Sequence, residues 1–125
     1  MIAYVTIGTN DMQRALGFYD ALLAEIGAKR LFGMDRIQFY GTSTKAPMLA
    51  VCVPYDEKPQ APGNGWMVAI PAGSREAVDR VHARALALGA TDEGAPGERI
   101  PNVFYGGYIR DLDGNKLCFM DMKVG

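Results

Sequence analysis

The pattern of apolar and polar positions in the first half of the chain predicts a strand, a helix and three more strands. β-Branched residues concentrate in Ile2–Gly8, which favours a strand. From Met12, apolar residues recur at steps of three and four, the spacing of one helix face. The stripe comprises Met12, Leu16, Tyr19, Leu23 and Ile26, and Gly27 follows it. Short apolar runs then predict strands at Lys29–Phe32, Arg36–Tyr40 and Met48–Val53.

The second half shows the same order of elements after a connector at residues 54–65, which holds three prolines and two glycines. Trp66–Pro71 predicts a strand, and Ser74 is suited to cap the helix that follows. The apolar stripe of that helix comprises Val78, Val81, Ala85 and Leu88. Three strands are predicted after it, at Thr91–Gly97, Phe104–Asp111 and Asn115–Asp121.

The two halves also match in spacing. Leu16 and Tyr19 of the first helix correspond to Val78 and Val81, 62 positions later, and both helices end in Gly-Ala. A shared helical stripe alone could arise by chance, but here the order of elements repeats as well. We therefore predict an α+β fold of two tandem βαβββ modules, about 1–53 and 66–122, in a single domain spanning 1–125.

The end of the chain predicts a β-hairpin. The alternating run Phe104–Arg110 meets the turn signal Asp-Leu-Asp-Gly-Asn at residues 111–115, and the apolar run Lys116–Met120 leaves it. An EF-hand interpretation of this turn fails, because its glycine comes too early and the twelfth position from Asp111 is Met122 rather than Glu.

An aromatic strand that ends in Arg-Asp-x-Asp-Gly-Asn before a short final strand resembles the last hairpin of the vicinal oxygen chelate superfamily, also called the glyoxalase/bleomycin-resistance/dioxygenase family. Tandem βαβββ modules are the architecture of that family, so the resemblance covers essentially the whole chain. It implies a curved, open, eight-stranded mixed sheet with both helices on the convex side. The concave face would hold the ligand.

Metal-dependent members of that family place His, His and Glu on inner strands, and the matching positions here hold Tyr4, Met67 and Cys118. A phenol, a thioether and a lone thiol do not reproduce such a ligand set. We therefore predict no cofactor, and a divalent metal only if the family's metal chemistry is retained. A soft-metal alternative is Cu(I) on Met67, Cys118, Met120 and Cys52.

The sequence offers few catalytic groups. His82 is the one histidine and lies one step beyond Val81 on the predicted helix, so we expect it to point partly to solvent. No Ser-His-Asp or Cys-His set can be assembled around it. Cys118 is the one candidate nucleophile, and it would need Lys116 or Arg110 to lower the pKa of its thiol.

Alternation along the strands assigns an aromatic, sulfur-rich and mostly uncharged set of side chains to the concave face. Such a lining suits a small, partly apolar ligand that is held by a few polar groups. Each side chain also has a structural explanation: the tyrosines could fill the sheet, the arginine could pair with a carboxylate, and the thiols could be small buried hydrophobes. The candidate ligand-binding residues are Tyr4, Tyr40, Cys52, Met67, Phe104, Tyr108, Arg110, Cys118 and Met120.

Composition narrows the partners. The net charge is −1 and the 13 basic residues are scattered, which argues against nucleic acid and against an anionic membrane surface. No apolar run is long enough for a bilayer span, and the start of the chain has no leader pattern, so we expect a cytoplasmic protein. Cys52 and Cys118 would then remain thiols.

Our leading interpretation is a metal-free protein that binds a small organic molecule in the groove of its sheet. This would resemble the drug-sequestering members of the family, which act as dimers with grooves between protomers, so we expect a homodimer. One alternative is a metal-dependent lyase of the glyoxalase type or an extradiol dioxygenase. A second is a thiol-dependent enzyme that uses Cys118, and whether the chain catalyses a reaction stays open.

Overall fold

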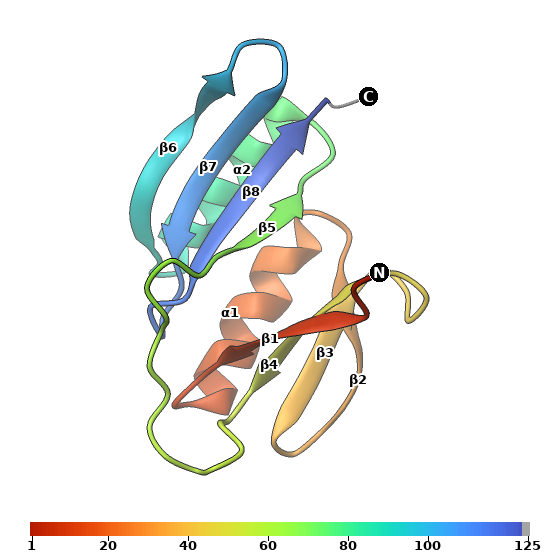
Figure 1. Cartoon of the computed structure of the whole chain (residues 1–125), viewed down its shortest axis with the longest axis vertical. Helices are drawn as coiled ribbons and strands as arrows, with labels where there is room; N and C mark the ends of the chain where they lie inside the picture. Colours follow the sequence, from red (N-terminus) through yellow and green to blue (C-terminus); the bar gives the residue numbers. More distant parts are fainter. Residues whose placement is uncertain (124–125) are drawn as a thin grey trace.

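The computed structural model describes residues 1–123 and contains two four-stranded mixed sheets, each with one helix (Figure 1). The first sheet has the order β1-β4-β3-β2 and the second the order β5-β8-β7-β6. The predicted α+β class with two βαβββ modules is confirmed, and the sheets are not closed. The last two residues of the predicted domain lie outside the described part. The elements are β1 (Tyr4–Gly8), α1 (Met12–Ala24), β2 (Lys29–Met34), β3 (Ile37–Gly41), β4 (Met48–Cys52), β5 (Val68–Pro71), α2 (Arg75–Ala87), β6 (Thr91–Ile100), β7 (Phe104–Arg110) and β8 (Lys116–Met122).

The duplication extends to the register of the strands. Val5 pairs with Leu49 between the parallel strands β1 and β4, and Val68 pairs with Leu117 between the parallel strands β5 and β8. In both sheets the other two pairings are antiparallel. Because side chains alternate between the faces of a strand, equal registers direct equivalent positions toward the helix in both modules.

The ends of the helices follow local sequence signals. The side chain of Asp11 accepts a hydrogen bond from the backbone N–H of Arg14 at the start of α1. Ser74 does the same for Ala77 at the start of α2, as the sequence predicts. After each helix the chain turns through a glycine with positive φ, Gly27 or Gly89, a conformation that glycine adopts without a steric penalty.

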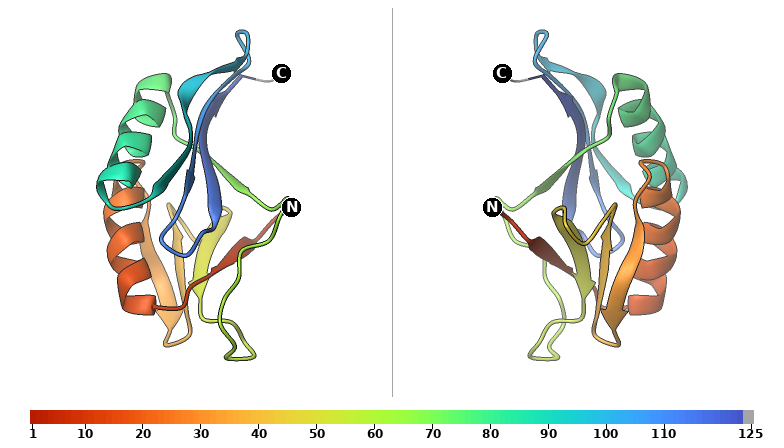
Figure 2. Two further views of the ribbon diagram at one scale, coloured as in Figure 1. Left: turned by 90° about the vertical axis from the view of Figure 1, so that its left-hand side faces the viewer. Right: turned by 90° about the vertical axis from the view of Figure 1, so that its right-hand side faces the viewer.

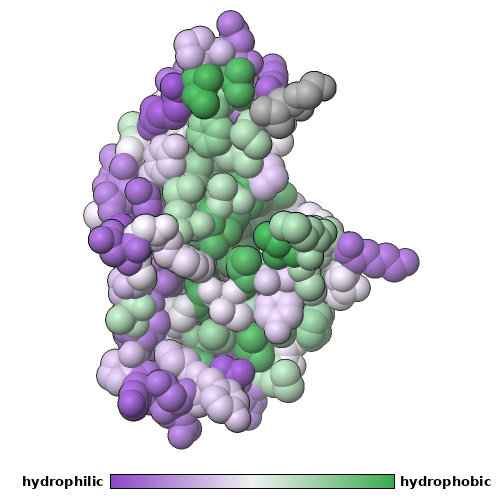
Figure 3. Space-filling view, viewed as in Figure 1, coloured by the Kyte–Doolittle hydropathy of each residue, from purple (hydrophilic) through white to green (hydrophobic). Residues whose placement is uncertain are grey.

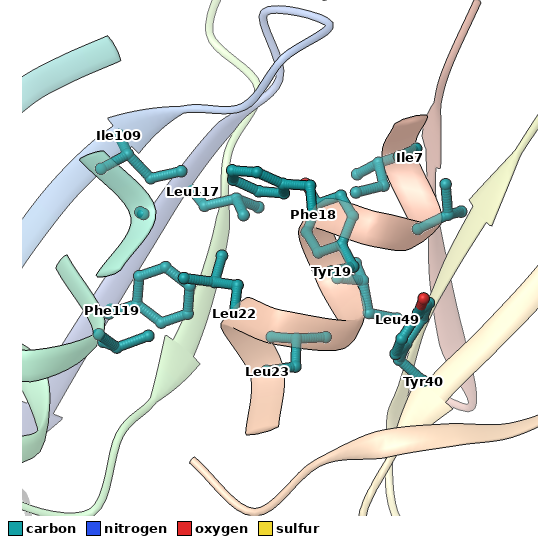
Figure 4. Packing of buried hydrophobic residues seen from close by; sticks show 14 of the residues in the cluster. Ile7, Phe18, Tyr19, Leu22, Leu23, Tyr40, Leu49, Ile109, Leu117 and Phe119 are labelled. Carbon is teal, nitrogen blue, oxygen red and sulfur yellow. The ribbon is translucent and has the colours of Figure 1, made fainter. Parts of the chain in front are cut away.

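Helix α1 packs against both sheets, and a different face of the helix contacts each sheet (Figure 4). Phe18 and Leu22 lie toward the second sheet, where they meet the side chains of β7 and β8. Tyr19 and Leu23 lie toward β3 and β4 of the first sheet. One hydrophobic core therefore joins the two modules. Its second-sheet members include Ile109, Leu117 and Phe119, each 0% exposed.

Both helices lie on the same side of the molecule, so the opposite faces of both sheets point the other way (Figure 2). We call these uncovered sides the open faces. Seen from that side, the molecule is apolar over much of its middle, with hydrophilic residues along the rim (Figure 3). No helix within residues 1–123 has the length and apolar character needed to cross a membrane.

Strand β6 runs to Ile100, beyond the predicted end at Gly97, and is irregular. Its pairing with β7 shifts register three times, between Asp92 and Gly94, between Gly94 and Gly97, and between Glu98 and Ile100. Such bulges keep a strand paired while inserting an extra residue, which bends the strand and re-aims its side chains. The segment is therefore paired strand where glycine and proline content alone would suggest a break.

Candidate functional site

Most of the predicted site residues lie on the open faces, but they are divided between two sheets. Tyr4 and Cys52 belong to the first sheet, where their strand neighbours Val5 and Val51 turn toward the helix side. The other open-face candidates belong to the second sheet or the residue just before it. These are Met67, Phe104, Tyr108, Arg110, Cys118 and Met120. The candidate ligand-binding residues of one chain therefore form two separate surfaces, one on each sheet.

Tyr40 does not lie on the open face, where the sequence predicted it, although it contributes to the wall of an apolar hollow between the two sheets. It is 0% exposed, packs in the core with Tyr19, and its hydroxyl donates a hydrogen bond of 2.6 Å to the carboxylate of Asp20. Burial and this hydrogen bond raise the pKa of the Tyr40 hydroxyl. The residues of β3 that face the open side are Ile37 and Phe39, which the prediction missed by one position.

An aromatic cluster occupies the open face of the first sheet. The ring of Phe39 packs edge-to-face with Tyr4 at 5.0 Å between centroids and stacks on Phe32 at 4.4 Å. Phe39 itself is buried, whereas Tyr4 and Phe32 are each 48% exposed. Offset and edge contacts of this kind stabilise a flat apolar surface that an aromatic ligand could extend.

A hollow of about 580 Å³ lies beside this cluster, between the first sheet and the connector. Its lining is mixed: Tyr4 and Cys52 come from the sheet, Arg36 from the turn before β3, and Gln60 from the connector. The side-chain oxygen of Gln60 is buried and has no hydrogen-bond partner among the described residues. Burial raises the pKa of the Cys52 thiol, so this hollow presents a neutral thiol.

A second hollow, of about 510 Å³, lies between the two sheets and is mainly apolar. Its walls come from β1, β4 and β5 and from the end of α1. Met67 and Trp66 line it on the side of the second sheet, and Ile2 lines it on the side of the first. All three side chains are more than one third exposed, which leaves an apolar surface between the edges of the sheets.

The open face of the second sheet is centred on Tyr108 and Cys118, which lie opposite each other on β7 and β8. The guanidinium carbon of Arg99 lies 5.4 Å from the centroid of the Tyr108 ring, and the ammonium nitrogen of Lys116 lies 5.5 Å from it. Burial raises the pKa of Tyr108, with the nearby Cys118 adding to the shift and Arg99 opposing it. Tyr108 is therefore a neutral phenol at ordinary pH.

Cys118 is 0% exposed, and burial raises the pKa of its thiol. The Tyr108 side chain and the charges of Arg99 and Lys116 act in the opposite direction without reversing the shift. A nucleophilic cysteine needs a lowered pKa and access to the substrate. The burial and raised pKa of Cys118 favour a structural role as a small buried hydrophobic side chain over a role as a nucleophile.

Arg110 is held by partners within its own sheet. Its Nε donates to the carboxylate of Glu93 at 2.7 Å, and a terminal nitrogen donates to the backbone oxygen of Gly114 at 3.0 Å. The pair with Glu93 neutralises its charge. Of the basic residues near Tyr108, Arg110 is thus the least available to a ligand.

His82 is buried, and the expectation that it points partly to solvent is wrong. It is 4% exposed, and its Nε2 lies 3.2 Å from Oδ1 of Asp92 and 3.2 Å from the backbone oxygen of Tyr108. His82 is buried because β6 and β7 pack against α2 on the helix face beside Val81 as well as on Val81 itself. His82 therefore belongs to the helix–sheet interface and lies away from the open face.

The sequence profile described as Glyoxalase/Bleomycin resistance protein/Dioxygenase superfamily matches residues 1–119. The chain belongs to this superfamily. The match covers both modules and ends within β8, so it includes the turn with the Asp-x-Asp-Gly-Asn motif. The family resemblance of the sequence is thereby confirmed. Among curated proteins, none matches the chain significantly.

Solved structures of other members have the same fold. A glyoxalase/bleomycin resistance protein from Albidiferax ferrireducens T118 is 34% identical, with a TM-score of 0.87 over 96% of this chain and 97% of its own. A family enzyme from Burkholderia phytofirmans PsJN is 19% identical, with a TM-score of 0.75 over 97% and 98%. Lactoylglutathione lyase from Agrobacterium tumefaciens is 22% identical, with a TM-score of 0.67 over 96% and 92%.

The positions that the family resemblance assigns to metal ligands do not carry metal-binding side chains here. Tyr4 lies on the first sheet, Met67 lies just before β5, and Cys118 lies on the second sheet as a buried neutral thiol. Within residues 1–123, no three His, Cys, Asp or Glu side chains are grouped so that they could share a metal ion. A phenol, a thioether and a protonated thiol do not fit a divalent metal that normally takes imidazole and carboxylate.

Proposed function

We propose that this superfamily member binds a small, partly apolar organic molecule on the open faces of its sheets, without a metal. The observation that carries the proposal is the chemistry of these faces. Tyr4, Phe32 and Met67 are between 41% and 48% exposed there, although aromatic and thioether groups are usually withdrawn from water. Exposed apolar groups beside hollows of several hundred Å³ suit a ligand of drug-like size.

We propose in addition that the binding unit is a homodimer. Among residues 1–123, β1 and β5 each pair with one neighbouring strand, so each leaves one edge with unpaired backbone groups. The apolar hollow lies between these edges. In a two-fold symmetric dimer, β5 of the second copy would lie beside β1 of the first, and β5 of the first beside β1 of the second. Each pairing would join two four-stranded sheets and cover both exposed edges. The open face of one copy's first sheet would then meet that of its partner's second sheet.

The dimer can be tested with one matched pair of substitutions. Met67 is 41% exposed at the hollow, and Leu86 is 37% exposed on the outer side of α2. We expect Met67→Asp to convert the dimer to a monomer in light scattering, because a carboxylate would be buried without a partner. We expect Leu86→Asp to leave the mass unchanged. A monomeric wild-type chain at tens of micromolar would contradict the proposal.

The ligand proposal is tested by a thermal-shift screen of small aromatic compounds, thiol conjugates and antibiotics. A ligand at one hundred times its dissociation constant stabilises the native state by about 2.7 kcal/mol, which raises the melting temperature measurably. Screening should be repeated after treatment with a chelator and after addition of Ni²⁺, Zn²⁺, Fe²⁺ or Mn²⁺. Binding or turnover that requires the metal would instead favour the lyase or dioxygenase alternative.

A further inference from the structure

We infer that the ligand carries an anionic group, and that Arg99 and Lys116 bind this group beside Tyr108 on the open face of the second sheet. The inference rests on the proposed function, because it specifies the chemistry of the same ligand. It concerns a part of the site that the sequence did not single out: Arg99 is absent from the candidate set, although its neighbour Tyr108 is included.

The strands place the two cations on either side of one phenol. Tyr108 lies on β7, and its flanking strands β6 and β8 contribute Arg99 and Lys116. Each charge lies within 5.5 Å of the centroid of the Tyr108 ring. The register shift between Glu98 and Ile100 explains how Arg99 reaches this face, because an extra residue in the bulge re-aims the side chain. Glu98, its neighbour, pairs with Arg75 of α2 on the helix side.

Both cations lack an anionic partner within residues 1–123. Six ion pairs are formed in this part of the chain, and none includes Arg99 or Lys116. The contrast with Arg110 on the same face is direct, since Glu93 neutralises that guanidinium at 2.7 Å. Two positive charges therefore remain uncompensated on one small area of a chain whose net charge is −1.

A purely structural role for Arg99 does not account for its charge. One terminal nitrogen donates to the backbone oxygen of Ala95 at 2.6 Å, which fastens the bulged end of β6. A guanidinium has five N–H donors, so most of its capacity is left for another acceptor. The backbone oxygen also carries no net charge, so the positive charge of Arg99, which is exposed to solvent, remains available to an anionic group of a ligand.

Apart from the carboxylate of Glu93, which is paired with Arg110, and the buried thiol of Cys118, the remaining groups near Tyr108 are donors or apolar. The phenol is protonated at neutral pH, because its ordinary pKa of 10.0 already lies well above that pH and burial raises it further, and so it can donate to an oxygen of the ligand. A guanidinium, an ammonium and a hydroxyl group together match the oxygens of a carboxylate or phosphonate. Phe104 and Met120 lie on the same face and offer contacts to an apolar body. The ligand class is therefore a small organic anion with an apolar or aromatic part.

Two probes of equal shape separate this inference from the proposed function. Benzoate and benzamide share the ring and differ in charge, and both can be titrated into the 125-residue chain and followed by NMR or calorimetry. We expect the wild type to bind benzoate roughly tenfold more tightly than benzamide, the ratio that charge-assisted hydrogen bonds typically provide. Added salt should reduce the preference, because the contact is partly exposed.

The variants are chosen to keep the fold. We expect Arg99→Gln and Lys116→Gln each to weaken benzoate binding several-fold and to leave benzamide binding unchanged. Arg99→Lys should restore most of the preference, which a role limited to the β6 bulge would not predict. Arg84→Gln is the matched control, because this substitution removes the same charge from the same module. Arg84 is exposed on α2, away from the open face.

The outcomes are distinguishable. If benzamide binds as tightly as benzoate and the Gln variants change nothing, the anion inference is overturned while the proposed groove stands. If neither probe binds, the inference fails together with the proposed function. If Arg84→Gln weakens benzoate as much as Arg99→Gln does, the effect is one of net charge, and the assignment to this site is wrong.

Discussion

The hydroxyl group of Tyr19 on α1 donates a hydrogen bond of 2.5 Å to the carboxylate of Asp111, in the turn between β7 and β8. Tyr19 is 1% exposed and Asp111 is 6% exposed, so the bond is shielded from water. It connects the helix of the first module to the last hairpin of the second. The carboxylate also accepts the backbone N–H groups of Asp113 and Asn115, each at 2.9 Å.

The rest of the Asp-x-Asp-Gly-Asn motif makes the same kind of connection. Asp113 accepts hydrogen bonds from the side chain of Arg14 at 2.8 Å and the backbone of Asn10 at 3.1 Å. The side-chain amide of Asn115 donates to the backbone oxygen of Gly8 at 2.8 Å. All three contacts join the turn to the end of β1 and the start of α1. The motif that carries the family resemblance therefore has a structural role, as the fastening between the two modules.

The first prediction concerns this fastening. We expect Tyr19→Phe to lower the free energy of unfolding by about 1–3 kcal/mol, because the buried carboxylate of Asp111 loses a donor. Tyr105→Phe is the control, since its hydroxyl donates to Asp79 at 2.6 Å in an exposed position where water can replace it. We expect a change below about 0.5 kcal/mol for the control. Urea unfolding monitored by circular dichroism measures both, and equal losses would contradict the proposed role of Tyr19.

The second prediction is an alkaline loss of stability from the same tyrosine. Burial, followed by the charge of Asp111, raises the pKa of Tyr19 well above its ordinary value of 10.0. Above that value the unfolded chain releases the proton more readily than the folded chain, so rising pH favours unfolding. The contribution is intact below pH 10.0 and declines above it, by at most about 1.4 kcal/mol per pH unit for one tyrosine.

The measurement is the urea midpoint across the alkaline range. We expect the midpoint of the wild type to fall more steeply above pH 10.0 than that of Tyr19→Phe, which has no hydroxyl to ionise. The Tyr105→Phe control keeps Tyr19 and should stay close to the wild type, because the hydrogen bond to Asp79 that raises the pKa of Tyr105 is exposed to solvent. Parallel curves for wild type and Tyr19→Phe would show that ionisation of this residue does not limit alkaline stability.

The features that the sequence predicts well are local ones. The stripe containing Leu16, Tyr19 and Leu23 predicts α1, and Ser74 predicts the start of α2, because helix periodicity and capping depend on residues a few positions apart. The duplication is local in the same sense, because it consists of equal spacings in the two halves. The family resemblance rests on these two features and the final hairpin, and the sequence profile over residues 1–119 confirms it.

The features that the sequence predicts poorly depend on contacts between helices and strands that are far apart in the chain. Phe18 and Leu22 lie off the predicted stripe of α1, yet they dock the helix on the second sheet and thereby fix how the two modules sit. A helix sequence that is apolar on two sides indicates that a second element packs against it. It does not indicate which element that is. Tyr40 shows a different limit, because a shift of one residue in a strand reverses which face each side chain meets.

The third prediction tests whether the modules unfold together. Leu22 is 0% exposed in the core that joins the two sheets, whereas Leu86 is 37% exposed on α2. We expect Leu22→Ala to lower the free energy of unfolding by about 2–5 kcal/mol and Leu86→Ala by less than about 0.5 kcal/mol. Because the core is shared, circular dichroism and the fluorescence of the one tryptophan, Trp66, should report a single transition. Separate transitions would indicate modules that fold independently.

The fourth prediction distinguishes a structural Cys118 from a catalytic one. Burial raises the pKa of both thiols, but Cys118 is buried in its sheet whereas Cys52 is partly exposed at the hollow beside the connector. The thiolate is the nucleophile that attacks an alkylating agent, and the agent must also be able to reach it. At neutral pH we therefore expect iodoacetamide to label Cys52 slowly and Cys118 more slowly still.

The two cysteines can be separated by single substitutions. Cys118→Ser leaves Cys52 as the only thiol, Cys52→Ser leaves Cys118, and mass spectrometry gives the rate of labelling for each. In urea above the unfolding midpoint both thiols should react at the rate of a free cysteine, which verifies that protection comes from the fold. If Cys118 in the native protein reacted faster than a free thiol, its pKa would have to be lowered rather than raised. The thiol-dependent alternative would then replace the binding function proposed for this face.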